Sequence, residues 1–79
     1  MEYDHKKVDE MVLALLSLNM FRDHDIHRAW KSQPWEALER LHAQGYIDDP
    51  VSKAKSVVMT EKGAKRAQKL FEKHFGSAT

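Results

Sequence analysis

Residues 23–27 contain two histidines three positions apart, His24 and His27, and the aspartates Asp23 and Asp25 stand on either side of the first. Histidine and aspartate are ligand types that zinc accepts, but a zinc site needs at least a third ligand from another part of the chain. His5 and His42 are the candidates, and no spacing rule brings either of them close. The simpler interpretation is that both histidines lie in solvent on a short polar helix, so we expect no metal and no cofactor.

Catalytic patterns are missing from the sequence. The chain has no cysteine, no glycine-rich phosphate loop, no HExxH segment and no Ser-His-Asp order in a strand-to-turn setting. The paired carboxylates Asp9 and Glu10 fall near the start of a predicted helix, where we expect them to be solvated. A chain of 79 residues is also too short to form a deep cleft between two layers, so we expect a protein that is not an enzyme.

Charge is the remaining candidate for function, and it is unevenly distributed. Residues 1–50 hold six basic and ten acidic side chains, a net charge of −4, whereas residues 51–79 hold seven basic and two acidic ones, a net charge of +5. A basic segment can attract nucleic acid or an acidic partner. Lysines at helical spacing are also common on an ordinary solvated helix face, so the pattern leaves both interpretations open.

Length and composition limit the class of protein further. Seventy-nine residues form one small domain, and the lack of cysteine excludes a secreted disulfide scaffold. The N-terminal segment has no apolar stretch of the kind that signal peptides contain. The longest apolar run, residues 11–16, is too short to cross a bilayer. These features predict a cytoplasmic protein with no membrane contact.

Residues 5–20 are predicted to form the first helix, which Asp4 caps with its carboxylate. Apolar side chains recur at helical spacing in a stripe that should face the core, formed by Val8, Met11, Val12, Leu15 and Leu18. A second stripe beside it consists of Leu13, Leu16 and Met20. Because this apolar arc is wider than one core face needs, the helix is either central in the domain or pairs with a second copy. A homodimer through the first and last helices is therefore one expectation.

Residues 22–33 are predicted to form a short helix, followed by a turn and a third helix over residues 34–44 that ends at Gly45. Trp30 and Trp35 stand on either side of the turn. Each tryptophan has two interpretations: a core residue that fixes the crossing of the two helices, or an exposed aromatic surface for a partner or a nucleobase. We expect both tryptophans to lie in the core.

Beta-branched residues predict a strand over residues 55–60, which pairs with a short extended segment after Gly45. Thr60 then caps a last helix over residues 61–75, and Gly63 has no side chain where this helix must pass the strand pair. The expected fold is α+β and mostly α, in the order helix, helix, helix, strand, strand, helix. It forms one domain over residues 1–76 with a frayed tail over 77–79. The predicted buried residues are Leu38, Leu41, Ile47, Met59 and Phe71.

Two segments resemble a known family. They are Leu38-x-x-Leu41-x-x-x-Gly45-Tyr46-Ile47 and, after a polar loop, Ser56-Val57-Val58-Met59-Thr60-Glu61-Lys62-Gly63. Together they are similar to the winged helix-turn-helix pattern of MarR- and PadR-type regulators, in which a two-stranded wing and a final helix follow the recognition helix. Residues 1–18, with Arg28-Ala29-Trp30-Lys31, also resemble a small bacterial family of domains of unknown function.

The resemblance implies that the helix over residues 34–44 enters the major groove of DNA and that the wing touches phosphates. On this basis the nucleic-acid-binding residues are Gln33, Arg40, Gln44, Lys53 and Lys55. Glu36 and Glu39 oppose this function, because two carboxylates on the same helix would meet the phosphate charge. Two functions therefore remain: a small, weakly DNA-binding module like a transcription regulator, or a winged-helix module that binds a protein partner and no nucleic acid.

Overall fold

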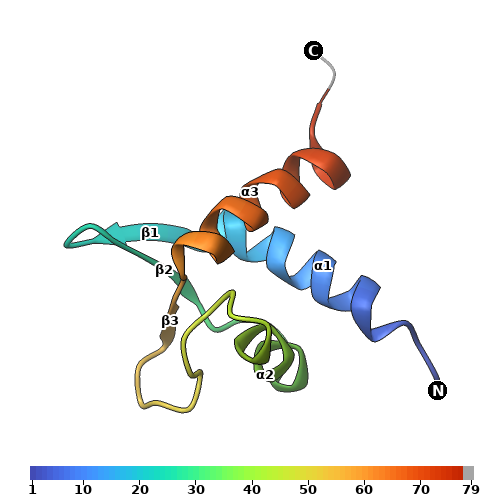
Figure 1. Cartoon of the computed structure of the whole chain (residues 1–79), viewed down its shortest axis with the longest axis horizontal. Helices are drawn as coiled ribbons and strands as arrows, with labels where there is room; N and C mark the ends of the chain where they lie inside the picture. The colour runs from blue at the N-terminus through green and yellow to red at the C-terminus, as the bar shows by residue number, and fades with distance from the viewer. Residues whose placement is uncertain (78–79) are drawn as a thin grey trace.

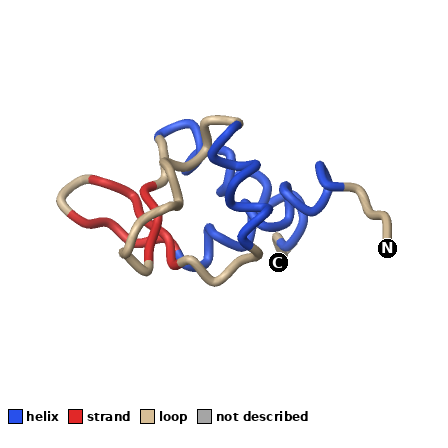
Figure 2. The backbone as a smooth tube through the Cα atoms, turned by 90° about the horizontal axis from the view of Figure 1, so that it is seen from below, coloured by secondary structure: helices blue, strands red, loops and turns tan. Residues whose placement is uncertain are grey.

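The computed structural model describes residues 1–77, which form three α-helices and a three-stranded antiparallel sheet. The elements in chain order are α1 (His5–Leu16), a 3₁₀ turn (Ser17–Asn19), β1 (Met20–Asp23), β2 (Ile26–Trp30), α2 (Trp35–Ala43), β3 (Ser56–Val58) and α3 (Glu61–Phe75). Figure 1 shows α1 packed along α3, α2 below them and the strands at one side. Figure 2 also shows the strands on one side of the molecule and the helices on the other. The predicted α+β class is confirmed.

Helix α1 begins where the sequence predicts and ends earlier. The carboxylate of Asp4 accepts a hydrogen bond of 3.1 Å from the backbone N–H of Lys7, so Asp4 is the N-cap. The helix stops at Leu16 instead of near residue 20, because the chain tightens into the 3₁₀ turn and enters β1 at Met20. Leu13 and Leu16 are 1% and 0% exposed, so the second apolar stripe belongs to the core of a single chain.

The short helix predicted for residues 22–33 is wrong, because this segment forms most of a β-hairpin. Asp23 pairs with Ile26, so two residues connect β1 and β2. These residues, His24 and Asp25, have φ angles of 52° and 66°, the left-handed conformation that the common two-residue hairpin turn requires at both positions. Glycine or asparagine usually fills such positions, so a turn built from histidine and aspartate carries little signal in the sequence.

The sheet has the strand order β1-β2-β3, and both strand pairs are antiparallel. The strand predicted over residues 55–60 is present as β3, although it is shorter. Its predicted partner contributes a single bridge, between Ile47 and Met59, while β2 pairs with its other edge and places Ala29 opposite Val57. The predicted two-stranded wing is therefore one edge of a larger sheet that includes the hairpin.

The helix-turn-helix of the expected fold is not formed within residues 1–77, because a hairpin and not a helix precedes α2. The winged-helix arrangement is accordingly not confirmed. The part of the pattern that the structure keeps is the order of α2, the extended residue Ile47, β3 and α3. The functional consequence is that, within residues 1–77, α2 does not directly follow a helix in the way that a helix-turn-helix requires.

The core lies between the three helices and the inner face of the sheet. Leu38, Leu41 and Ile47 are each 1% exposed and Met59 is 4% exposed, so these four predictions are confirmed. Phe71 is only partly buried at the edge of the core, where its ring lies 5.4 Å from that of Phe75 in the next turn of α3. The prediction for Phe71 is thus only partly correct.

Thr60 and Gly63 hold the start of α3 close to the end of α2. The hydroxyl oxygen of Thr60 accepts a hydrogen bond from the N–H of Gly63 at 2.9 Å and donates one to the carbonyl oxygen of Gly45 at 2.7 Å. Gly45 has a φ of 83° and ends α2 as predicted. A Cβ atom at Gly63 would overlap the backbone carbonyl of Tyr46, which confirms that the last helix passes this segment at close range.

None of the helices in residues 1–77 is long and apolar enough to cross a lipid bilayer. Helix α3 ends at Phe75, and residues 76–77 continue outside it. The rest of the predicted frayed tail, residues 78–79, lies outside the described part of the chain.

Candidate nucleic-acid interface

Arg40, a predicted DNA contact, is held in an ion pair between α2 and α1. Its Nε donates to both carboxylate oxygens of Asp9, at 2.9 and 2.8 Å, and its Nη2 lies 2.8 Å from Oδ1 of the same residue. Hydrogen bonding to Asp9 raises the pKa of the Arg40 guanidinium above its ordinary value. Asp9 is 5% exposed, so its predicted position in solvent is wrong. The ion pair joins α2 to α1 and neutralises the charge of Arg40 within the fold.

The other polar residues predicted around α2 do not form a basic surface either. Gln44 is exposed, and its side-chain amide donates a hydrogen bond of 3.2 Å to the carbonyl oxygen of Arg40. Gln33 is partly buried in the link between β2 and α2. Glu36 and Glu39 are exposed, as predicted. Helix α2 therefore presents two carboxylates to solvent.

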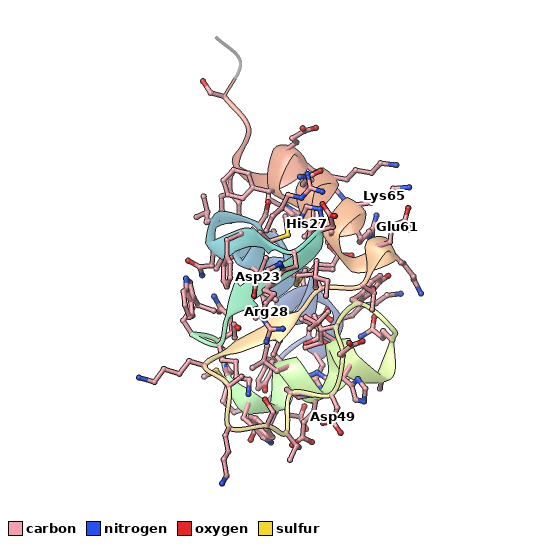
Figure 3. The ribbon with its side chains drawn as sticks, turned by 90° about the vertical axis from the view of Figure 1, so that its left-hand side faces the viewer. Asp23, His27, Arg28, Asp49, Glu61 and Lys65 are labelled. Carbon is pink, nitrogen blue, oxygen red and sulfur yellow. The ribbon has the colours of Figure 1, made fainter. Side chains whose placement is uncertain are left out.

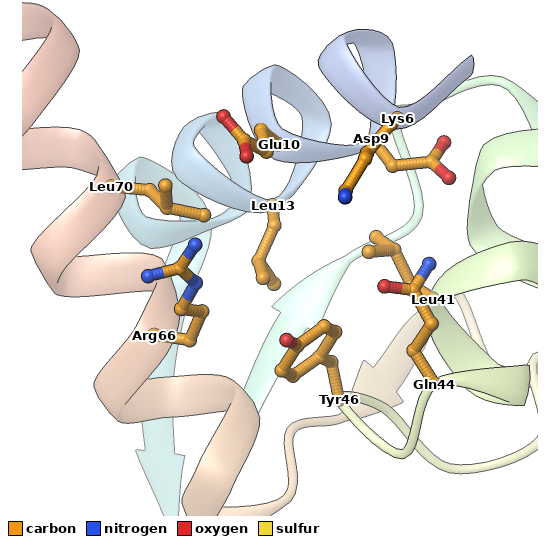
Figure 4. A pocket seen from close by; sticks show the side chains of 9 residues that line it. All are labelled: Lys6, Asp9, Glu10, Leu13, Leu41, Gln44, Tyr46, Arg66 and Leu70. Carbon is orange, nitrogen blue, oxygen red and sulfur yellow. The ribbon is translucent and has the colours of Figure 1, made fainter.

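A cleft of about 80 Å³ opens between α1, α3 and the end of α2 (Figure 4). Leu13, Leu41 and Tyr46 point into it, and charged residues of both signs, such as Glu10 and Arg66, surround them. This volume has room for only a few water molecules. Because the charges alternate in sign and the space is small, the cleft is not suited to a polyanion.

A larger groove of about 550 Å³ runs between the hairpin and α3. Figure 3 shows His27, Glu61 and Lys65 near one another beside the start of α3. The two histidines of the sequence pattern separate here: His27 lines the groove, whereas His24 is exposed in the hairpin turn with its Nε2 3.5 Å from the carboxylate of Asp23. Among residues 1–77, no three histidine, aspartate or glutamate side chains gather where they could hold a metal ion.

The outer face of the sheet carries two aromatic side chains, of which Trp30 is exposed and Phe21 is partly buried. Because side chains alternate along a strand, burial of Ala29 in the core turns Arg28 and Trp30 outward, and Phe21 turns outward opposite Arg28. The rings of Phe21 and Trp30 lie 4.9 Å apart between centroids and are tilted by 30°. Trp30 is 51% exposed and Ile26, on the same face, is 46% exposed, so this face is open.

The prediction that both tryptophans lie in the core is wrong. Trp35 is 45% exposed at the start of α2, and Trp30 is more exposed still. Both were expected to fix a crossing between two helices, and the first of those helices does not exist in this part of the chain. The alternative interpretation, an exposed aromatic surface, therefore describes Trp30 better.

Arg28 occupies the middle of the outer face, opposite Val58 on β3. Its Nε donates a hydrogen bond of 2.8 Å to the hydroxyl oxygen of Ser56, and its Nη2 donates one of 3.3 Å to the carbonyl oxygen of the same residue. Both partners are neutral, so they fix the position of the guanidinium without cancelling its charge. Arginine held in this way is suited to phosphate or to the face of a base.

Lys53 and Lys55, the last two predicted contacts, are exposed in the loop over residues 48–55. The loop is tied to the end of β2, because the N–H of Lys31 donates to the carbonyl oxygen of Lys55 at 2.9 Å and its ammonium donates to the carbonyl and the hydroxyl oxygen of Ser52, both at 3.1 Å. Trp30 pairs with Ser56, so the tether holds the loop beside the aromatic face. We call this set the aromatic–basic surface: Phe21, Arg28, Trp30, Lys53 and Lys55.

The aromatic–basic surface thus combines two of the five predicted residues with Trp30, for which an exposed aromatic surface was the alternative interpretation, and with two residues that sequence reasoning missed. Phe21 and Arg28 were missed because the segment around them was expected to be helical. The aromatic and β-branched side chains of Phe21, Ile26 and Trp30 favour strands, and this signal would have led to the hairpin.

The fold and the site define a small α+β domain with an open aromatic and basic sheet face. The chain belongs to the family described as a domain of unknown function, DUF6429, which matches residues 4–77. It is 45% identical over 75 residues to the uncharacterized protein y4hR of Sinorhizobium fredii (strain NBRC 101917 / NGR234), a match that covers 95% of this chain and 97% of that protein. No solved structure is significantly similar to the chain. The predicted likeness to a bacterial family of unknown function is confirmed, whereas nothing in these comparisons shows a relationship to MarR- and PadR-type regulators.

Proposed function

We propose that this protein is a small nucleic-acid-binding module that uses the aromatic–basic surface. The observation that carries the proposal is the tether from Lys31 to Lys55 and Ser52, which holds two exposed lysines beside an exposed tryptophan. Cations supply most of the sequence-independent affinity for nucleic acid, and aromatic rings accept bases. A protein partner can also use cations and aromatic rings, so the oligonucleotide titration described below distinguishes the two kinds of partner.

This mode of binding differs from the one that the resemblance to transcription regulators implies. In that mode α2 would enter the major groove, but its exposed carboxylates Glu36 and Glu39 would meet phosphate, and Arg40 is paired with Asp9. Contacts from lysines to phosphate position a nucleic acid without reading its sequence. We therefore expect weak binding with little sequence preference, led by the loop.

The test is the salt dependence of binding, measured by fluorescence anisotropy with labelled single-stranded and duplex oligonucleotides. Replacing Lys53→Gln together with Lys55→Gln should weaken binding to whichever form is bound. The slope of log K against log salt should fall by about two, because each phosphate contact contributes about one.

The matched control is Lys69→Gln with Lys73→Gln, which removes the same charge from exposed positions on α3. The C-terminal half of α3 lies far from the loop over residues 48–55 (Figure 1), so the slope should stay close to that of the wild type. If the α3 variant loses the binding and the loop variant keeps it, the interface is wrong. If the wild type binds no oligonucleotide at low salt, nucleic-acid binding is excluded.

One observation favours a second candidate, self-association through α1. Val8, Met11 and Leu15 are only partly buried and line an apolar hollow of about 320 Å³, and Leu18 just beyond them is 65% exposed. The homodimer interface would then lie on this side of α1. Sedimentation at about tens of micromolar, where weak dimers form, should show a species larger than 9.2 kDa that Met11→Glu removes; a wild type that stays at 9.2 kDa would exclude it.

A further inference from the structure

We infer that the aromatic–basic surface binds single-stranded DNA, with unpaired bases stacked on Trp30 and Phe21 and phosphates held by Arg28, Lys53 and Lys55. The inference rests on the proposed function and adds the kind of nucleic acid that the site selects. Three features of the surface carry it: the support of the exposed indole, the placement of the cations near it, and the scarcity of hydrogen-bond acceptors among its outward-facing strand residues.

The indole of Trp30 is supported and accessible at the same time. Phe21 lies on the neighbouring strand and packs against it at 4.9 Å with a tilt of 30°, while half of Trp30 remains in solvent. A ring held in this way loses little further freedom when a base stacks on it, so the platform is already organised for binding. Stacking tolerates any base because every base has an aromatic face.

The cations occupy positions close to this platform along the strands and the loop. Arg28 is two residues before Trp30 on the same face of β2, and its guanidinium is positioned by Ser56. Lys55 directly precedes Ser56, the residue that pairs with Trp30. A strand whose base stacks on Trp30 can therefore place its flanking phosphates next to Arg28 on one side and the loop lysines on the other.

The surface fits a single strand better than a duplex. In a duplex, neighbouring base pairs cover the base faces, and proteins reach only the edges in the grooves and the backbone. The rings of Trp30 and Phe21 would then find no partner. Among the described residues, no helix belongs to the aromatic–basic surface, so this face cannot place a recognition helix in the major groove. Unpaired bases use both the rings and the cations.

Deoxyribose suits the surface better than ribose. A protein distinguishes RNA by hydrogen bonding to the 2′-hydroxyl. The hydroxyl of Ser56 is bonded to Arg28, and the residue is 8% exposed. Asp23 is the one carboxylate among the outward-facing strand residues, and a carboxylate repels the adjacent phosphate. A 2′-hydroxyl would lose water against this face and find few acceptors among its outward-facing strand residues, so ribose binds less well than deoxyribose and we take single-stranded DNA as the ligand.

Tryptophan fluorescence tests the inference directly. In a Trp35→Phe protein, Trp30 is the single tryptophan. Titration with an oligothymidylate of about ten nucleotides, within the range that such surfaces cover, should quench its emission. The same strand paired with its complement should bind more weakly. A Trp30→Phe protein is the matched control, because its single tryptophan, Trp35, lies outside the aromatic–basic surface and should show little quenching.

Substitution of the platform gives the size of the effect. Trp30→Leu keeps an apolar side chain at a half-exposed position, so the thermal unfolding curve should stay close to that of the wild type. Binding to oligothymidylate should weaken about 5- to 150-fold, the change that corresponds to about 1–3 kcal/mol of stacking lost at one base. Trp30→Tyr restores an aromatic face and should recover much of the affinity. If both variants bind like the wild type, stacking on Trp30 is excluded.

The outcomes separate this inference from the proposed function. Quenching of Trp30 by oligothymidylate, with weaker binding of both the duplex and oligouridylate, supports the inference. Tighter or equal binding of the duplex or of oligouridylate overturns it. The proposed function stands in that case if the loop lysines still carry the salt dependence. An absence of binding to all three probes overturns both.

Discussion

The two arginines Arg40 and Arg28 show how differently the helical layer and the sheet treat charge. In the helical layer, the guanidinium of Arg40 lies 2.8 Å from the carboxylate of Asp9, so its charge is neutralised within the fold. On the sheet, the partners of Arg28 among residues 1–77 are the hydroxyl and the carbonyl of Ser56, which are neutral and leave its charge available. The value of a basic residue for binding is therefore set by its partner in the fold and not by its place in a sequence motif.

The largest expected effect comes from a substitution at the junction between the two regions. Gly63→Ala places a Cβ against the backbone carbonyl of Tyr46, and backbone yields less easily than a side chain. We expect the free energy of unfolding to fall by more than about 3 kcal/mol, at or beyond the upper range for overpacking. Urea unfolding followed by circular dichroism measures it. Gln68→Ala, at an exposed position on the same helix, is the control, and stability equal to the control would show that α3 does not pass Tyr46 closely.

The next effect is confined to the helical layer. Leu41→Ala empties a site that is 1% exposed at the base of the small cleft, and we expect a loss of about 2–5 kcal/mol in the free energy of unfolding. Leu18→Ala, at a residue that is 65% exposed, should change stability by less than about 0.5 kcal/mol. Equal losses for the two variants would contradict the assignment of the core.

Exchanging the two arginines for glutamine tests the comparison itself. Arg40→Gln leaves the buried carboxylate of Asp9 without a cation and should lower stability, while affinity for oligothymidylate stays unchanged. Arg28→Gln should lower the affinity and have the smaller effect on stability. Adding Asp9→Asn to Arg40→Gln should recover part of the lost stability, which a double-mutant cycle measures. If the two arginine variants lose stability and affinity to the same extent, the two regions do not treat charge differently.

The smallest expected effect concerns the acidic face of α2. Glu36→Gln with Glu39→Gln removes two negative charges near bound nucleic acid, and we expect binding to strengthen slightly at low salt and to match the wild type at high salt. Anisotropy titrations at two salt concentrations measure this difference. Loss of binding to one particular sequence would instead show that these carboxylates read bases and that α2 is the interface.

Local features of the fold could be predicted from the sequence because their causes are local. The caps Asp4 and Thr60, the left-handed Gly45 and the last helix all depend on residues within one turn of each other. The turn of the hairpin carries little local signal, since it uses two residues with positive φ and neither is glycine, so the strand preference of the residues around it was overlooked. The error placed a helix in the expected fold where the hairpin lies, and the predicted helix-turn-helix depended on that helix.

Only part of the candidate site could be predicted, because contacts between residues far apart in the sequence decide which side chains remain free to bind a ligand. Arg40 is 31 residues from Asp9, and no spacing rule joins positions so far apart. The loop lysines were recognised by their charge and their place before a strand. Their neighbours Phe21 and Trp30 became part of the surface only because β1 and β2 pair.

The central claim is that the sheet face, and not α2, contacts nucleic acid, and amide chemical-shift mapping tests it most directly. The 9.2 kDa chain is suited to ¹H–¹⁵N correlation spectra recorded during titration with oligothymidylate. We predict that the largest shifts map to Phe21, Arg28 and Trp30 and to the loop over residues 48–55, and that Glu36 and Glu39 shift little. Largest shifts along α2, with the strands unchanged, would contradict the claim.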